Sequence, residues 1–443
     1  MRSSTTSSAS SKTSATSRPP TLFGSMTTTS NLSPVHGGLA APVNRHVDAS
    51  KAAEFAGLSV KLAVDDNDRT SLYRIADGTL SPLEGPMGKA DYDSVLSRKA
   101  IERGGKLWAW TIPISLPVTD AEAAQLKAGD TVALENGGKV FGKLTVDSVF
   151  DWDKGAFIQA VYGTDRTDHP GARLWTSDER TKLVGGSIEV VPFSDDREFA
   201  ERVMGPTAMR QLIEKEGYEQ SIGFQTRNPL HRAHEYALVY GAETILRETG
   251  KRTGVILNPL VGQLKGDDVP AATRMKTYEA LVAGRFLGEG DKDESLWKDK
   301  GQDLNDNLKL AGLDIRMFYG GPSEAVMHAI YRQNLGLTHF IIGRKHADAP
   351  FDDKSAIWGD FDAQEVFQKL GGDLSIKTVN VGFAAFFEEL GRVGLVKENK
   401  DKTSVNISGT KMREILGNGE MPDDRVMRPS TAKILVEHYA SKK

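Results

Sequence analysis

From about Asp196 onward, short apolar runs alternate with stretches long enough to form helices. Strands are expected at 221–224, 254–257, 314–318, 338–342 and 375–381, and helices at 230–248 and 322–335. Strands that alternate with helices indicate a parallel sheet, because each helix carries the chain back to the edge where the next strand starts. Ligands of such sheets bind beyond the carboxyl ends of the strands. A functional site is therefore expected in the loops after Phe224, Leu257, Phe318 and Ile342.

Residues 44–192 show a different pattern, in which short β-branched and aromatic runs are separated by turn residues. Strands are expected within 106–115, 131–134 and 140–149, with Asn136-Gly137-Gly138 as the turn before the last of them. The pattern indicates a mostly antiparallel β domain with one or two helices. The spacing of Gly137, Gly142 and Lys143 is close to the phosphate loop of ATPases. Leu144 has no hydroxyl for Mg²⁺ and the segment is predicted to be a hairpin, so a phosphate loop is not expected.

The start of the chain differs from both regions. Residues 1–30 contain ten Ser and eight Thr, and no acidic residue precedes Asp48. So few apolar groups cannot offset the entropy of ordering, and 1–33 is predicted to be a disordered leader. Such a leader is typical of a transit peptide, which would place the protein in a plastid or another organelle; without that address the protein is expected in the cytoplasm. The expected divisions of the chain are 1–33, 34–200, 201–395 and a charged, helical 396–443.

Composition excludes several classes of protein and site. The chain has 443 residues, which suggests two or three domains, and no apolar stretch approaches the roughly 20 residues that span a bilayer. It contains no Cys, which excludes disulfides, thiolate nucleophiles and iron–sulfur clusters. The formal net charge is −4, but 1–47 carries four basic residues and no acid, so 48–443 holds 52 Lys and Arg against 60 Asp and Glu. Anionic ligands must therefore be attracted by local groups.

The loop after the first strand of the α/β region carries most of these groups. It reads Gln225-Thr226-Arg227-Asn228-Pro229-Leu230-His231-Arg232-Ala233-His234. Pro229 suits the first position of a helix, and His231 and His234, three residues apart, would then share one face of its first turn. A helix N-terminus favours anions through its free N–H groups and its dipole. Two imidazoles, a guanidinium and several amide or hydroxyl groups thus indicate a polyphosphate pocket.

Other interpretations of the two histidines are a zinc half-site or ordinary surface residues. Zinc requires a third protein ligand, and the sequence contains no His-Glu-x-x-His pattern. A His-x-x-His pair at a strand-to-helix turn resembles the arrangement in nucleotidyltransferases of the HIGH type, although Arg232-Ala233 stands between the histidines here. Those enzymes carry a second basic motif, which Ile407 to Arg413 would supply through Lys411 and Arg413, unless this segment is a plain helix capped by Ser408.

The segment Gln225 to His234 resembles the signature of the ATP sulfurylase, or sulfate adenylyltransferase, family. Further segments resemble that family in the expected order over 34–443, namely Leu83 to Met87, Asn258 to Tyr278, Gly320 to Ala325 followed by Gly343 to Ala347, and Ser408 to Arg413. The resemblance implies a PUA-like, mostly β domain, then a Rossmann-like nucleotidyltransferase domain and a small C-terminal α/β subdomain. It also implies the reaction of ATP with sulfate to give adenosine 5′-phosphosulfate and pyrophosphate with Mg²⁺, and a homo-oligomer without nucleic-acid or membrane partners.

The resemblance also implies roles for single residues. Gln225, Arg227 and the Ala347 backbone would hold sulfate, and Thr226 and Asn228 would lie against the α-phosphate. His231 and His234 would stabilise the phosphates and the leaving pyrophosphate. The nucleotide would be held by Gln225, Asn228, Gly343, Arg344, Lys345, His346, Phe383 and Ala385, the last two together with Ala384 flanking the adenine. No residue is expected to ligate a metal, and without a phosphate loop the expected product is adenylylsulfate.

The chain departs from the family in one loop. Where the family commonly has Gly-Arg-Asp-His-Ala-Gly, this sequence has Lys345 as the third residue and Asp348 as the sixth. The change to Lys345 alters the charge by two units beside the expected nucleotide. Asp352-Asp353-Lys354 is interpreted as a solvated loop, with a Mg²⁺-associated role as the alternative.

Two other functions fit parts of the pattern. A related adenylyltransferase that activates a phosphorylated or carboxylated substrate would share the histidine pair but would not need Gln225-x-Arg227. A binding module is the second, because PUA-like domains can bind RNA. The acidic ordered region, which has no basic patch interleaved with aromatic residues, argues against RNA binding.

Overall fold

The computed structural model describes residues 31–193, 198–262, 269–407 and 409–441. Most of the predicted leader, Ser408 and part of the Asn258 to Tyr278 segment lie outside these residues. Within them, none of the helices combines the length and the apolar content that a membrane-spanning helix requires.

The first region, 31–193, is built on a five-stranded mixed sheet of order β1-β5-β6-β7-β4. Its strands are β1 (Lys61–Ala63), β4 (Leu116–Val118), β5 (Thr131–Asn136), β6 (Lys139–Asp151) and β7 (Lys182–Val190). A separate hairpin joins β2 (Ala100–Arg103) and β3 (Lys106–Ala109). The helices of this region are α1 (Lys51–Ala56), α2 (Asp66–Ala76), α3 (Lys89–Arg98), α4 (Asp120–Ala123), α5 (Lys154–Tyr162) and α6 (Pro170–Thr176).

The turn between β5 and β6 confirms the hairpin prediction. Gly137 and Gly138 have φ of 55° and 79°, which suits the two central positions of a primed hairpin turn. Gly142 and Lys143 lie inside β6, where Lys143 pairs with Glu189 on β7 at 3.1 Å. The phosphate-loop interpretation is thereby excluded, because these residues form a sheet and not a strand-to-helix loop.

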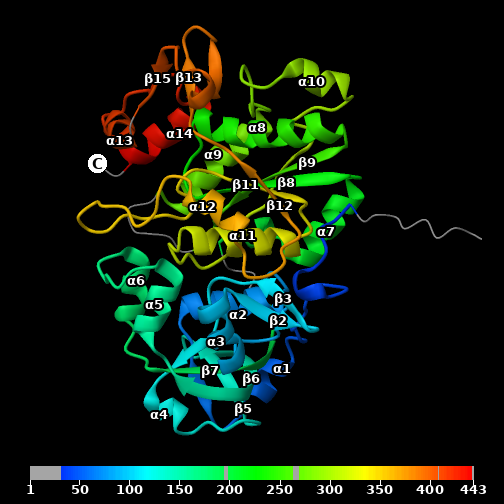
Figure 1. Ribbon diagram of the computed structural model, residues 1–443, viewed down its shortest axis with the longest axis vertical. Helices are drawn as coiled ribbons and strands as arrows, with labels where there is room; N and C mark the ends of the chain where they lie inside the picture. The colour runs from blue at the N-terminus through cyan, green and yellow to red at the C-terminus, as the bar shows by residue number, and fades with distance from the viewer. Residues whose placement is uncertain (1–30, 194–197, 263–268, 408, 442–443) are drawn as a thin grey trace, which may run out of the picture. The chain divides into compact units, whose positions relative to one another are not determined.

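The second region is an α/β unit with a five-stranded parallel sheet of order β10-β9-β8-β11-β12. The strands are β8 (Gln220–Thr226), β9 (Thr253–Pro259), β10 (Leu308–Leu310), β11 (His339–Ile342) and β12 (Lys377–Asn380). The helices are α7 (Pro206–Lys215), α8 (Arg232–Thr249), α9 (Ala271–Ala283), α10 (Glu294–Asp299), α11 (Pro322–Asn334) and α12 (Asp362–Glu365). Figure 1 shows α8 and α11 on opposite sides of this sheet.

Neighbouring residues of β11 enter different parts of the core. Ile341 packs in the cluster that contains residues of α8, and Phe340 and Ile342 pack in the cluster that contains residues of α11. A parallel strand covered on both faces reads as a continuous apolar run, which is why the sequence identified β8, β9 and β11.

The strand predicted at 314–318 is wrong. The edge strand is β10, and 314–318 is extended chain without ladder pairing. Its apolar groups bury against the first region instead, where the Phe318 ring stacks on Trp175 with centroids 5.9 Å apart. The Phe318 carbonyl accepts a hydrogen bond from the Tyr162 hydroxyl (2.8 Å), so the segment is held by tertiary contacts.

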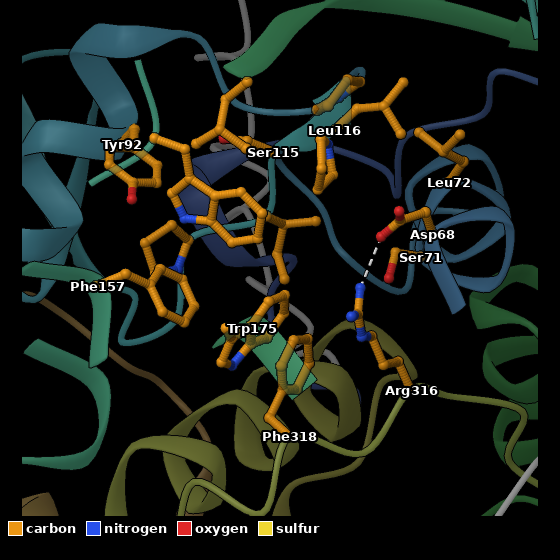
Figure 2. A pocket seen from close by; sticks show the side chains of 16 residues that line it. Asp68, Ser71, Leu72, Tyr92, Ser115, Leu116, Phe157, Trp175, Arg316 and Phe318 are labelled. Atoms are coloured by element: carbon orange, nitrogen blue, oxygen red, sulfur yellow. Dashed lines mark hydrogen bonds and ion pairs between the residues drawn. The ribbon is translucent and has the colours of Figure 1, made fainter. Parts of the chain in front are cut away.

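A small crevice lies beside this contact and has a volume of about 30 Å³. Figure 2 shows Arg316 and Phe318 on one side of it, near Asp68 of α2 and Trp175. Asp68 is buried and lies 2.7 Å from Arg316 and 3.0 Å from Arg180. A space of this size admits only one or two water molecules, so the crevice is a packing junction and not a ligand site.

The C-terminal part combines a three-stranded sheet of order β14-β13-β15 with two helices. Its elements are β13 (Ala384–Phe387), β14 (Arg392–Leu395), β15 (Ser404–Val405), α13 (Gly409–Gly417) and α14 (Pro429–Ala440). The sheet joins residues on both sides of the predicted division at 395. Single 3₁₀ turns occur at His36–Gly38, Ala200–Arg202, Val366–Gln368 and Val396–Glu398.

Candidate active site

A cavity of about 430 Å³ opens at the carboxyl ends of β8, β11 and β12. The chain runs from β8 to β9 and β10 on one side, and places β11 on the other side of β8. This change of direction leaves a crevice between the loops after β8 and β11, which is where open α/β sheets bind ligands. The lining side chains from these loops are Gln225, Thr226, Arg227, Asn228, His231, His234, Gly343, Arg344, Lys345, His346, Ala347, Asp348 and Phe383.

The loop after β8 uses its own polar groups to set its shape. The Thr226 hydroxyl donates a hydrogen bond to the Asn228 carbonyl (2.9 Å) and accepts one from the Asn228 N–H (3.2 Å). The Tyr278 hydroxyl of α9 also donates to the Asn228 carbonyl (2.8 Å). Thr226 is therefore committed to the turn through the Asn228 backbone, and the exposed Asn228 lines the cavity.

This turn moves the start of the helix. The prediction that it begins at Pro229 is wrong, because α8 begins at Arg232 and His231 precedes it in an extended conformation. The His231 carbonyl accepts the N–H groups of His234 (2.9 Å) and Glu235 (3.1 Å). The two histidines nevertheless share one face, as predicted, and their rings stack with centroids 3.7 Å apart.

Both imidazoles are neutral at neutral pH in the free protein. Burial lowers the pKa of His231 to about 4. Burial and the neighbouring His231 lower the pKa of His234 well below its usual range. The Nδ1 atoms of both rings are buried without a hydrogen-bond partner, so the pair is arranged for a ligand and not for the protein's own groups.

The start of α8 is held from the C-terminal part. The Arg232 N–H donates to the Val426 carbonyl (2.8 Å), and Arg428 pairs with buried Glu235 at 2.7 Å. Burial raises the pKa of Glu235 to about 7 against the opposing effect of Arg428. Through these bonds the C-terminal part fixes the turn of helix that carries His234.

Arg227 and Gln225 supply the polar end of the cavity. The Arg227 guanidinium lies over the Tyr319 ring, 5.4 Å from its centroid. Arg227 Nη1 and Gln225 Oε1 are buried without hydrogen-bond partners. A guanidinium with a free donor and an aromatic support suits a tetrahedral oxyanion, which it can contact through two N–H groups.

The loop after β11 has an unusual backbone. Lys345 and Ala347 have φ of 51° and 55°, which is uncommon for residues with a side chain. The Lys345 N–H donates to the Asp360 carbonyl (3.0 Å), and the Ala347 carbonyl accepts the Gly321 N–H (3.1 Å). Strain of this kind is typical of binding loops that the surrounding structure holds in place.

The positive charges of Arg344 and Lys345 in this loop are partly balanced by a nearby carboxylate. Asp360 lies 3.2 Å from Arg344 and 3.6 Å from Lys345. The side chain of Lys345 is 38% exposed, so it faces both the cavity and solvent. Among the described lining residues, Arg227, Arg344 and Lys345 oppose the single carboxylate of Asp348, which gives the cavity a positive balance.

One wall of the cavity is flat and apolar. The Phe383 ring is 44% exposed, and the Arg344 guanidinium lies 3.6 Å from its centroid. Ala384 lines the cavity beside it, whereas Ala385 does not and is buried. Neighbouring residues of β13 face opposite sides of the strand, so the Ala385 side chain points away from Ala384, and a role of Ala385 in holding the nucleotide stays a prediction.

Several charged groups proposed from the sequence lie elsewhere. Lys411 and Arg413 of α13 do not line the cavity, and Ser408 lies outside the described residues. Asp352 pairs with Arg173 at 2.6 Å and Asp353 with Arg166 at 3.0 Å. These largely exposed aspartates tie their loop to the first region through ion pairs, which the sequence analysis did not predict.

The sequence analysis did not identify several other residues near the cavity. The Gln364 amide donates to the carbonyls of Ile342 (2.8 Å) and Val381 (3.0 Å), which fixes the ends of β11 and β12. Glu324 and His328 of α11 lie behind His346. Their spacing of four residues on a predicted helix placed them on one face, and only the fold shows which face meets the cavity.

Across the described ranges, no three His, Asp or Glu side chains gather closely enough to hold a metal ion by themselves. Asp348 Oδ1, which belongs to a carboxylate that lines the cavity, is buried without a hydrogen-bond partner, as Gln225 Oε1 is.

Comparison with known proteins agrees with this architecture. Residues 200–438 match the family model described as ATP-sulfurylase, and residues 32–193 match the model of a PUA-like domain. The chain belongs to the ATP-sulfurylase family. The fold predicted from the sequence, a PUA-like domain followed by an α/β catalytic domain, is confirmed.

The chain resembles other members of this family over most of its length. A protein named sulfate adenylyltransferase from Pyropia yezoensis is 69% identical over 93% of this chain and 98% of that protein. One of the same name from Synechococcus sp. (strain JA-3-3Ab) is 34% identical over the same shares. Among solved structures, the hexameric APS kinase from Thiobacillus denitrificans superimposes with a TM-score of 0.66 at 19% identity, over 92% of this chain and 68% of that chain. This last likeness concerns the fold alone.

Proposed function

We propose that this protein is a sulfate adenylyltransferase, which converts ATP and sulfate into adenosine 5′-phosphosulfate and pyrophosphate. The observation that carries this proposal is the combination of the stacked His231–His234 pair and the Arg227 guanidinium in one positive cavity at the switch point of the sheet. The two relatives described above, each of which is matched over 98% of its length, are named sulfate adenylyltransferase.

The reaction is a displacement at the α-phosphorus of ATP. A sulfate oxygen forms the new bond to this phosphorus. The bond between the α-phosphorus and the oxygen that bridges the α- and β-phosphates breaks. The electron pair of that bond leaves with pyrophosphate. Sulfate is a weak nucleophile and both reactants are anions, so the protein contributes by positioning them and offsetting their repulsion.

Sulfate is assigned to the end of the cavity with Arg227 and Gln225. The unpartnered Arg227 Nη1 would donate to a sulfate oxygen, and the Gln225 amide and the Ala347 N–H would complete the set of donors. The Tyr319 ring keeps the guanidinium plane in place. These three donors would orient sulfate so that one of its oxygens points toward the nucleotide.

The α- and β-phosphates are assigned to the loop after β8 and the start of α8. The Asn228 side chain would contact the α-phosphate, and Thr226 would act by holding the turn that presents it. His231 and His234 are neutral in the free protein and would donate hydrogen bonds to the phosphate oxygens that gain charge. Neutral donors stabilise this charge without repelling each other across 3.7 Å.

The nucleoside is assigned to the wall formed by Phe383 and Ala384, with Gly343 to His346 around it. The exposed Phe383 ring offers a stacking surface for adenine. Arg344 occupies one face of that ring, so adenine would stack against the guanidinium or replace it.

The cavity also fits the Mg²⁺ that accompanies ATP. Mg²⁺ is held mainly by substrate phosphates and water together with one or two carboxylates, and Asp348 with its unpartnered Oδ1 is the lining carboxylate. When bound, Mg²⁺ would neutralise phosphate charge. The chain's own residues would do the remaining work of holding both anions in line.

The family resemblance also suggests a homo-oligomer. Light scattering on the purified full chain would test this, and a mass equal to one 48.2 kDa chain at working concentration would contradict it.

The decisive experiment measures pyrophosphate release by the full chain with ATP and Mg²⁺. Release should depend on sulfate and also on its mimic molybdate. A panel of phosphorylated and carboxylated acceptors tests the alternative of another adenylyltransferase, which would release pyrophosphate with one of them and not with sulfate. The Arg227→Ala variant is the control for the assigned sulfate end.

A further inference from the structure

A chain of buried polar groups leads from α11 to the cavity, in which a carboxylate lies at ion-pair distance from one histidine and that histidine is hydrogen-bonded to a second. Glu324 Oε1 lies 3.3 Å from His328 Nε2, and His328 Nδ1 lies 2.9 Å from His346 Nε2. Glu324 and His328 are fully buried, and His346 lines the cavity. The three side chains therefore connect a hidden carboxylate to a group that a ligand can reach.

The direction of these bonds follows from Glu324. Its Oε1 accepts the Phe318 N–H (2.9 Å) and its Oε2 accepts the Gly320 N–H (3.0 Å). Both carboxylate oxygens thus act as acceptors. A carboxylate oxygen 3.3 Å from His328 Nε2 would repel a lone pair on that nitrogen, so it favours the tautomer with the proton on Nε2. A neutral imidazole with its proton on Nε2 has an acceptor at Nδ1.

His346 must then donate to His328. Its Nε2 carries the proton that His328 Nδ1 accepts, which leaves Nδ1 of His346 without a proton as long as the ring is neutral. The ring is kept neutral by its surroundings, because burial, and after it the neighbouring His328 and Arg332, lower the pKa of His346 well below its usual range.

Arg332 strengthens this effect from one turn further along α11. It is fully buried, its Nη1 donates to the His328 carbonyl (3.3 Å), and its guanidinium lies 4.7 Å from the centroid of the Phe340 ring. A buried cation beside the two histidines disfavours a second positive charge on either of them.

A neutral His346 in this tautomer differs from the cationic groups of the cavity. Arg227, Arg344 and Lys345 donate hydrogen bonds to anions, whereas Nδ1 of His346 can only accept one. An anionic phosphate has no proton to offer this nitrogen. A hydroxyl or amino group does, and the nucleoside part of ATP carries both.

We propose that Glu324 and His328 are positioning residues, which hold His346 as the Nε2-protonated tautomer so that its Nδ1 accepts a hydrogen bond from the nucleoside of ATP. The ligand in this statement rests on the proposed function. The tautomer does not, because it follows from the carboxylate of Glu324 beside His328 and from the hydrogen bond between the two histidines.

The tautomer is tested by nitrogen-15 NMR of the full chain labelled at histidine, without any substrate. The His346 signals are assigned by their loss in His346→Asn. We expect Nε2 to show the shift of a protonated ring nitrogen and Nδ1 that of an unprotonated one. A His346 protonated at Nδ1, or at both nitrogens, at neutral pH would overturn the proposal.

Two variants of His328 test the connection. Asn can place an acceptor near the position of Nδ1, so His328→Asn should keep the wild-type shifts of His346. His328→Phe removes the acceptor, and the two ring shifts should move toward each other as the tautomers exchange. Unchanged shifts in His328→Phe would show that His328 does not hold the ring.

Ligand titration separates this proposal from the proposed function. A non-hydrolysable ATP analogue should move the Nδ1 signal of His346, and pyrophosphate alone should leave it in place. The reverse result would overturn the assignment to the nucleoside. Neither result depends on whether sulfate is the second substrate.

Kinetics give the second readout. Loss of one hydrogen bond predicts a rise of about tenfold in the KM for ATP of His328→Phe, with the KM for sulfate changed by less than about twofold. His328→Asn should restore most of the affinity for ATP. His339→Asn, at the amino end of β11, is the matched control and should leave both constants unchanged. Equal rises in both KM values would indicate a general structural effect and contradict the proposal.

Discussion

The rings of His231 and His234 stack with their planes 21° apart, one before α8 and the other on its first turn. Two imidazolium ions at this distance would repel each other, and the lowered pKa of each ring shows that the pair is neutral in the free protein. The pair therefore offers N–H donors to phosphates at the positive end of a helix without the charge of two cations.

Replacement of His234 by Ala should lower kcat by about 100-fold or more, because it removes a donor aimed at charge that develops in the transition state. His231→Ala should have an effect of similar size. Sulfate-dependent pyrophosphate release measures both, and His339→Ala is the control for loss of a histidine elsewhere in the same sheet. Wild-type turnover of His234→Ala would remove this residue from the site.

Arg227→Lys should raise the KM for sulfate by about tenfold, since lysine keeps the charge but loses the planar group that lies over Tyr319 and contacts an oxyanion through two N–H groups. The KM for ATP should change less. Tyr319→Leu tests the support of the guanidinium and should raise the KM for sulfate in the same direction. If Arg227→Lys affects only ATP, the sulfate end of the cavity is assigned wrongly.

The sequence predicted those features that depend on local pattern. The strands around Ser221–Phe224 and Gly254–Leu257 were found because parallel strands are apolar on both faces. The residues after β8 and β11 were found because the carboxyl ends of parallel strands meet at one edge. The predicted site residues of these two loops do converge on one cavity, namely Gln225, Thr226, Arg227, Asn228, His231, His234 and Gly343 to Ala347.

What the sequence missed depends on contacts between distant residues. The run at 314–318 has the composition of a strand, and only its burial against Trp175 and Tyr162 shows why it pairs with no neighbour. Pro229 is a good first residue for a helix, but the Thr226 turn and the tie from Arg232 to Val426 delay the start to Arg232. The partners of His346 lie on α11, whose orientation no local pattern reveals.

Lys345→Asp should raise the KM for ATP by about tenfold, because it places an anion beside Asp360 and the phosphates of ATP. Lys345→Ala should have a smaller effect, since it removes one partly exposed cation. An unchanged KM for ATP in Lys345→Asp would show that the Lys345 side chain contacts solvent and Asp360 and does not contact ATP.

Asp68→Ala should destabilise the protein by about 3–5 kcal/mol, because it leaves the largely buried guanidinium of Arg316 without its carboxylate. Arg180 loses one of its partners and keeps Asp178 and Asp65. Asp352→Ala, which breaks an exposed pair with Arg173, should leave the unfolding midpoint in urea unchanged. It should also leave the dependence of activity on Mg²⁺ unchanged. A shifted Mg²⁺ dependence would support the metal-associated interpretation of this loop.

The stability of the protein should fall in mild acid because of buried neutral histidines such as His36. Its Nε2 donates to the Ala109 carbonyl at 2.9 Å, and burial lowers its pKa to about 4 from 6.5. Between these two values the unfolded chain binds the proton and the folded protein does not, so unfolding becomes easier as the pH falls from 6.5 to 4. The stability that the neutral His36 contributes is fully present above pH 6.5, and its full loss would amount to about 3 kcal/mol.

His36→Gln should be less stable than wild type at pH 7 and should lose less stability between pH 6.5 and 4. Urea unfolding at several pH values measures this difference, and an equal slope for both proteins would show that His36 titrates as it does in the unfolded chain.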